Sequence, residues 1–169
     1  MARAVRASAG KDGAADSQAQ EDKFYRAMSQ NITKRRLEQD DPYAGRTLPK
    51  LTGLVTGMAI EVLRKPNGSQ ELFDSLIRGV NRAISETLFE GAGGAREFAI
   101  QLWSRSANDV AAEFMKGKLK VDPAALLDAL KRNFSESEDF LRELDGLRTL
   151  MAMKGAVPQE KDLKKYRRR

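Results

Sequence analysis

The chain has 169 residues, of which 41% are hydrophobic and 32% are charged, and this composition suits one helical domain with a modest core. It contains no cysteine and no histidine, which excludes disulfides, thiolate metal sites and the commonest general base. No apolar run approaches the length of a transmembrane helix, and the first residues lack the apolar stretch of a secretory signal.

The net charge of +6 is unevenly distributed along the chain. Residues 1–36 hold eight Lys and Arg against four Asp and Glu, and residues 154–169 hold seven against two. The stretch between them, 37–153, holds fifteen against eighteen. This layout predicts that the two basic ends contact a polyanion or an acidic partner surface.

The first segment, residues 1–20, is mostly small and polar, with Val5 as its only large aliphatic residue after Met1. Such a segment cannot bury enough apolar surface to offset the entropy cost of ordering. We therefore expect a disordered N-terminal tail over residues 1–20.

Residues 21–153 carry apolar positions at the three-and-four spacing of amphipathic helices. The expected helix starts are Glu21, Thr47, Asn67 or Ser69, the position after the glycines at 91–94, Asp122-Pro123, and Ser135 paired with Glu138 as a capping box. The sequence thus predicts an all-α fold, a helical bundle of about five to six helices with disordered basic N- and C-terminal tails. The assembly domain is expected over 21–153 and the basic C-terminal tail over 154–169.

Two features point to close helix contacts. Gly53 and Gly57 lie four residues apart on one side of the second helix, where each costs roughly 1 kcal/mol of helix propensity relative to alanine. Either another helix approaches closely there, or the two glycines are simply tolerated. Trp103 lies on an apolar stripe, which predicts a place in the core or in a subunit contact.

The apolar helix faces are wider than a small monomer needs, so we expect a homo-oligomer. The last helix has a heptad-like seam with four-three-four spacing. The predicted interface residues are Leu54, Met58, Phe140, Leu144, Leu147 and Met151.

Nothing in the sequence indicates catalysis. A Walker loop needs a preceding strand and a Lys-Ser/Thr pair, whereas a helix precedes the glycines at 91–94 and Ala95-Arg96 follows them. These glycines are therefore interpreted as a hinge between helices. The last helix also carries a group of carboxylates, interpreted as a solvated face rather than a two-metal site. They are Glu136, Glu138, Asp139, Glu143 and Asp145. We predict no enzymatic activity, no catalytic residue, no metal and no cofactor.

The basic runs are the strongest functional signal, because lysine and arginine neutralise phosphates and release counterions. Tyr166 adds a ring that can stack on a base. The predicted nucleic-acid-binding residues are Lys34, Arg35, Arg36, Lys161, Lys164, Lys165, Tyr166, Arg167, Arg168 and Arg169. A solubilising tail, a localisation signal or a docking signal for a partner is the alternative interpretation. A helix-turn-helix around residues 66–68 is not favoured, because Gln70, Glu71 and Asp74 supply no positive charge for a recognition helix.

The run from Phe114 to Phe134, FMKGKLKVDPAALLDALKRNF, resembles a segment of small terminase subunits of tailed bacteriophages, with a glycine-containing turn before a capped, leucine-bearing helix. The resemblance implies a non-enzymatic, ring-forming protein that binds viral DNA and passes it to a packaging motor. It also implies a location in the host cytoplasm or in the virion. The alternative is a phage structural, scaffolding or internal virion protein that docks a motor, portal or capsid protein through its basic tail.

Overall fold

The structure is a computed structural model that describes residues 2–34, 47–65 and 70–154, with side chains described from residue 17 to 33 in the first range. The elements are α1 (Ala2–Lys34), α2 (Thr47–Arg64), α3 (Gln70–Ala83), the π-helical segment η1 (Ile84–Leu88), α4 (Ala95–Met115), α5 (Ala124–Asn133) and α6 (Glu138–Ala152). The predicted all-α helical bundle is confirmed. None of the described helices has the length and apolarity needed to span a membrane.

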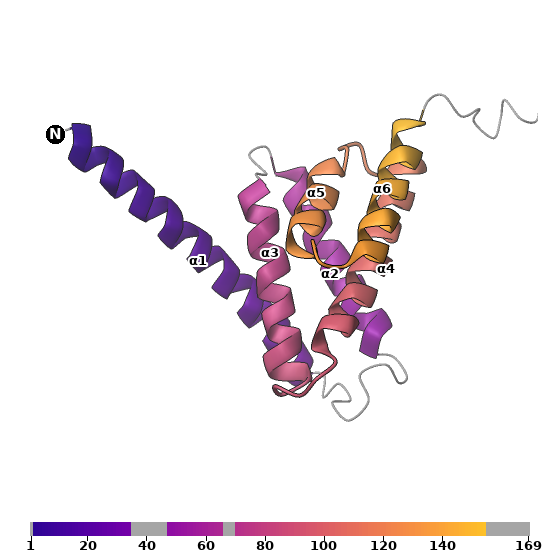
Figure 1. The fold of residues 1–169 in the computed structure, drawn as a ribbon, viewed down its shortest axis with the longest axis horizontal. Helices are drawn as coiled ribbons and strands as arrows, with labels where there is room; N and C mark the ends of the chain where they lie inside the picture. The colour runs from indigo at the N-terminus through magenta and orange to yellow at the C-terminus, as the bar shows by residue number, and fades with distance from the viewer. Residues whose placement is uncertain (1, 35–46, 66–69, 155–169) are drawn as a thin grey trace, which may run out of the picture.

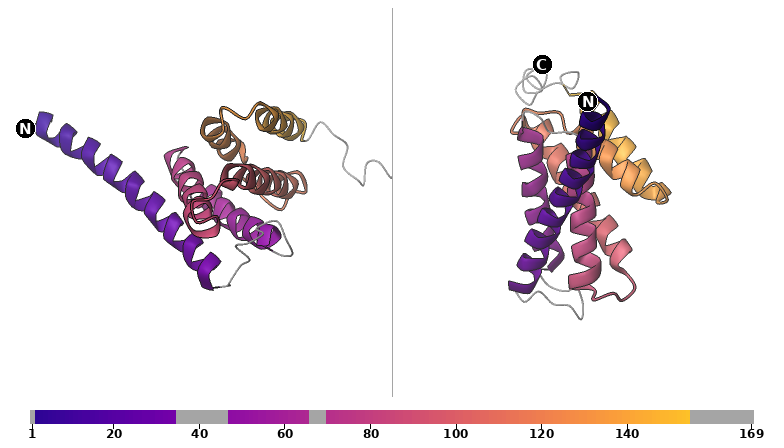
Figure 2. Two further views of the ribbon diagram at one scale, coloured as in Figure 1. Left: turned by 60° about the horizontal axis from the view of Figure 1, so that its bottom comes forward. Right: turned by 90° about the vertical axis from the view of Figure 1, so that its left-hand side faces the viewer.

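The helices form a layered bundle around α3 and α4 (Figure 1). α1 packs along α3, α5 packs on α3, and both α2 and α6 pack on α4. In a view roughly along the helix axes, α5 and α6 lie on one side of α3 and α4, and α2 lies on the other side (Figure 2, left). Each helix therefore covers the apolar face of a neighbour, as amphipathic helices must in a small domain.

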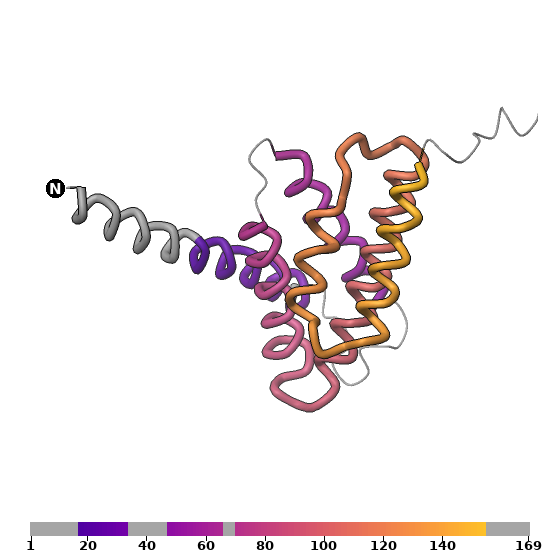
Figure 3. Tube along the Cα trace, turned by 45° about the horizontal axis from the view of Figure 1, so that its top comes forward, coloured from indigo at the N-terminus to yellow at the C-terminus, as the bar shows by residue number. Residues whose placement is uncertain are grey.

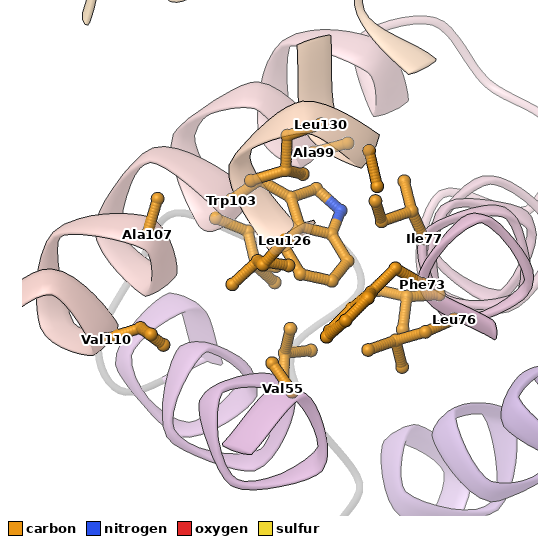
Figure 4. Packing of buried hydrophobic residues seen from close by; sticks show 14 of the residues in the cluster. Val55, Phe73, Leu76, Ile77, Ala99, Trp103, Ala107, Val110, Leu126 and Leu130 are labelled. Carbon is orange, nitrogen blue, oxygen red and sulfur yellow. The ribbon is translucent and has the colours of Figure 1, made fainter. Parts of the chain in front are cut away.

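Trp103 is at the centre of the core (Figure 4). Its side chain is fully buried among Val55 of α2, Phe73 and Ile77 of α3, and Leu126 of α5. The indole Nε1–H donates a 2.8 Å hydrogen bond to the Asn81 side-chain oxygen, so burial leaves this polar group satisfied. The predicted core position of this tryptophan is confirmed.

The contact between α1 and α3 depends on one glycine. A Cβ atom on Gly79 would lie 2.6 Å from the backbone oxygen of Glu21 and 2.9 Å from the Cβ of Phe24. Only a residue without a side chain allows the two helices to come this close. Farther along the same contact, Met28 and Ile32 of α1 are fully buried.

Arg82 of α3 reinforces this contact from its edge. Its guanidinium donates to the Asp22 carboxylate at 3.0 Å and stacks over the Tyr25 ring at 3.8 Å. The pKa of Asp22 lies below its usual value, chiefly because of this hydrogen bond and then because of the one from Gln18. The pKa of Arg82 is raised, chiefly by the same bond to Asp22.

The last part of the third predicted helix is π-helical and not α-helical. In this part, η1, the Phe89 N–H bonds the Ile84 carbonyl five residues back, at 2.9 Å. The wider turn keeps Ile84 and Leu88 buried while Thr87 reaches the Ser29 hydroxyl of α1 at 2.9 Å. The glycines at 91–94 then connect η1 to α4, and the hinge interpretation of this segment agrees with its geometry.

The predicted C-terminal boundary of the N-terminal tail needs correction. Residues 17–20, which the prediction assigns to the tail, belong to α1 (Ala2–Lys34), and the Ser75 hydroxyl of α3 donates to the Ser17 carbonyl at 3.2 Å. The part of α1 that packs on α3 therefore begins before Glu21.

Two other local features are decided by the structure. Of the two alternatives for Gly53 and Gly57, the tolerated pair holds among the described residues, because a Cβ atom on either glycine would have no neighbour within 4 Å. The last helix has Ser137 at its N-cap and no side-chain capping bond, because Ser135 belongs to the preceding turn. By contrast, Asp122 accepts from the Ala124 N–H at 2.9 Å and caps α5 as predicted.

Candidate nucleic-acid interface

Most of the predicted nucleic-acid-binding residues lie outside the described residues. Lys34 is the last residue of α1, where only the backbone is described. The other members of the predicted set that fall outside are Arg35, Arg36, Lys161, Lys164, Lys165, Tyr166, Arg167, Arg168 and Arg169. Lys154 is the first residue of the predicted basic tail and the only one that the structure describes.

Lys154 is held against the end of α4. Its Nζ donates to the Phe114 carbonyl at 2.5 Å and lies 3.9 Å from the centre of the Phe114 ring. The ammonium thus satisfies a carbonyl at a helix C-terminus, where positive charge is favoured. The last turn of α6 and the connection between α4 and α5 consequently lie at the same end of the bundle (Figure 3).

That connection carries three exposed lysines, Lys116, Lys118 and Lys120, which we call the lysine loop. The residues between them point the other way, since Gly117 is half-buried and Leu119 is only 2% exposed. Gly117 has a φ of +79°, a value that glycine adopts without strain. The backbone N–H groups of residues 118 and 119 both bond the Glu113 carbonyl, at 2.9 and 3.1 Å, and fix the turn.

Several surface cations are paired within the bundle. Arg82 bonds Asp22, Arg132 bonds Asp74 at 3.1 Å, and Lys131 bonds Asp145 at 2.6 Å. The lysine loop makes no ion pair with any residue in the described part of the chain, and the same holds for isolated cations such as Lys23 and Lys50. The loop differs from them because its three lysines lie within five residues. Its charges are therefore available to an external anion.

Comparison of the chain with protein-family models, with curated proteins and with solved structures finds no match.

The carboxylates of the last helix are on the surface, as predicted, and are engaged in local contacts. Glu136 bonds Arg96, and its pKa is lowered, first by its own backbone N–H and then by this guanidinium. Glu143 accepts from Ser104 and, at 2.8 Å, from the Asn108 amide. No group of three or more acidic residues in the described ranges is placed to hold a metal ion.

The described surface includes two hollows lined partly by polar side chains. One, of about 450 Å³, is bordered by Ser29, Gln30, Thr33 and Thr87, and it carries no charged side chain among these residues. The other, of about 280 Å³, runs between α4 and α6, where Ser104 already donates to Glu143.

The predicted interface residues divide into two groups. Phe140, Leu144, Leu147 and Met151 are at most 9% exposed, because the seam of α6 packs against the subunit's own core. In this conformation they have no surface to offer a second copy. Leu54 and Met58 of α2 are half-buried and remain partly accessible.

The helix-turn-helix alternative gains no support from the described residues. The first turn of α3 exposes Gln70 and Glu71, neither of which is cationic. The next turn is occupied by α5, because Asp74 bonds Arg132 and Asn133. This helix start therefore has neither the charge nor the exposure of a recognition helix.

Sequence reasoning missed the lysine loop as a site. Its three lysines fall in the stretch 37–153, whose net charge is mildly negative, and a net charge summed over the whole stretch does not reveal a local group of cations. The run K-G-K-L-K from Lys116 to Lys120 was the available signal, because it groups three cations within five residues.

Proposed function

We propose that this protein is a non-enzymatic, self-associating assembly protein that binds nucleic acid through its basic ends. The resemblance of residues 114–134 to small terminase subunits makes recognition of viral DNA for packaging the specific form of this proposal. Its setting would be the host cytoplasm, with the packaging motor or portal as protein partner.

One observation carries the proposal. Lys154 is held at the end of α4, close to the exposed lysine loop, and the sequence places six further cations after Lys154. Positive charge from two distant parts of the sequence, Lys154 and the lysine loop, thereby lies at one end of the bundle. A concentration of unpaired cations is the electrostatic feature expected of a protein that binds a phosphate backbone.

The proposal is tested by measuring the affinity for a mixed-sequence DNA duplex as a function of salt. The full chain is compared with a chain ending at Gly155 and with a full-length variant whose tail cations are all glutamine. The substituted positions are Lys161, Lys164, Lys165, Arg167, Arg168 and Arg169. The second variant keeps the length of the tail and removes only its charge.

Each phosphate contact contributes about 0.9 to the slope of log affinity against log salt, so losing six cations should lower the slope by up to about 5. Both variants should bind more weakly than the full chain, and by similar amounts. If both bind like the full chain, or if the full chain does not bind DNA, the proposed function is wrong.

A second candidate function, the docking of a structural protein partner, is favoured by a separate observation. Leu150 and Met153 at the end of α6 are 46% and 48% exposed, close in sequence to Lys154. Apolar and cationic groups together suit a protein surface with acidic and apolar groups. Substituting serine for both residues should then weaken binding to a purified capsid, portal or motor protein after nuclease treatment, and leave DNA affinity unchanged.

A further inference from the structure

We infer that the lysine loop is a phosphate-backbone binding site on the folded body, which holds a nucleic acid next to the point where the tail emerges. The inference rests on the proposed function and adds to it a site outside both basic ends. Lys116, Lys118 and Lys120 form the site, and Lys154 lies beside it.

The site is preorganised because the backbone beneath the lysines is fixed. Leu119 is buried in the core and acts as an anchor, and two backbone N–H groups bond the Glu113 carbonyl. Binding therefore costs the ordering of three side chains and not of the loop itself. A cation on a fixed backbone loses less entropy on binding than one on a mobile segment.

The spacing of the lysines suits a nucleic-acid strand. Residues two apart in a chain lie at most about 7 Å apart, and the turn at Gly117 brings Lys116 and Lys118 within that limit. Phosphates of one strand of duplex DNA follow each other every 3.4 Å along the helix axis, so two steps cover about the same distance. Each of Lys116, Lys118 and Lys120 can therefore meet a different phosphate of one strand.

The local charge balance remains positive. Two acidic side chains lie beside the loop in sequence, Glu113 in the last turn of α4 and Asp122 before α5. Asp122 is already used, because its carboxylate accepts the Ala124 N–H. Against these two anions are four cations, the three of the lysine loop and Lys154. An anion at this end consequently meets net positive charge from the folded body.

The test changes charge at the loop while the tail stays intact. In the full chain, the variant K116Q/K118Q/K120Q is compared with the control K23Q/K50Q/R105Q. The control loses the same three charges at exposed positions of α1, α2 and α4. A third variant, K116R/K118R/K120R, keeps the charge at the loop. Far-UV circular dichroism checks that each variant is folded.

The probe is a mixed-sequence DNA duplex, titrated between about 50 and 200 mM salt. Three phosphate contacts should contribute about 3 to the slope of log affinity against log salt. When the salt rises fourfold over this range, the affinity of the loop variant should therefore fall by a factor roughly 50-fold smaller than that of the control. The arginine variant should bind like the wild type. If the loop variant and the control have the same slope and affinity, the inference is overturned.

Vesicles containing phosphatidylserine provide the second arm, because lipid headgroups also present phosphate. If the loop variant loses vesicle binding but keeps wild-type DNA binding, the assignment to nucleic acid is wrong. The two proposals fail separately. A tail-neutral variant that no longer binds DNA, together with a loop variant that matches its control, would leave the proposed function standing and remove this inference.

Discussion

Replacing Gly79 by alanine is the sharpest test of how α1 is attached to the bundle. The new Cβ would lie 2.6 Å from the Glu21 carbonyl oxygen, whereas Cβ atoms essentially never approach other heavy atoms closer than 3.0 Å. Because that oxygen belongs to the backbone of α1, it cannot rotate away. The two helices must separate by at least about 0.4 Å, which also strains the bond from Ser75 to Ser17 and the bonds of Arg82 to α1.

The expected cost follows from a comparison with a second glycine. Gly146 of α6 is exposed, and nothing lies within 4 Å of a Cβ built on it. Glycine to alanine within a helix gains roughly 1 kcal/mol of propensity at either site, so this term cancels between the two variants. Overpacking remains, and it should make G79A less stable than G146A by about 1–3 kcal/mol.

Urea denaturation followed by far-UV circular dichroism measures this difference, and amide hydrogen exchange locates it. The extra exchange in G79A should be concentrated in α1 and in the part of α3 around Gly79. G57A, also at an open and exposed site, should behave like G146A. If G79A proves as stable as G146A, the close contact between α1 and α3 does not exist as described.

Two further predictions concern the same bundle. The pKa of Asp22 is lowered in the folded state, so its contribution to stability is present above the unfolded value of about 3.9 and is lost as the pH falls through the lower folded value. The D22N variant should lack this part of the loss of stability at low pH. If the unfolding free energies of D22N and the wild type fall in parallel as the pH is lowered, Asp22 does not make this contribution. We expect copies of the chain to associate through the outer face of α2, where Leu54 and Met58 are partly accessible. Light scattering should then give a mass above the 18.8 kDa of one chain. G57R, at an open site, should return the protein to a single chain, and a one-chain mass for the wild type across micromolar concentrations would refute association.

The sequence alone was sufficient to place the helices and most of the core. Apolar periodicity identified each helix of the assembly domain, and local chemistry located starts such as the one at Asp122, whose carboxylate caps α5. The buried position of Trp103 was also predictable, because this residue lies on the apolar face of its helix, and such a face is rarely exposed. These features depend on residues close in sequence, and local rules describe such residues well.

The tertiary structure alone decided which helix covers each apolar face. The seam from Phe140 to Met151 has the spacing of an oligomer contact, yet α6 packs it against its own subunit. Likewise, Gly53 and Gly57 have the spacing of a close helix contact, but Gly79 is the glycine that makes one. Periodicity shows that a face must be buried and says nothing about its partner, because the partner is chosen by packing between residues far apart in the chain. The same long-range packing brings Lys154 to the end of α4, beside the lysine loop, a placement that no local pattern contains.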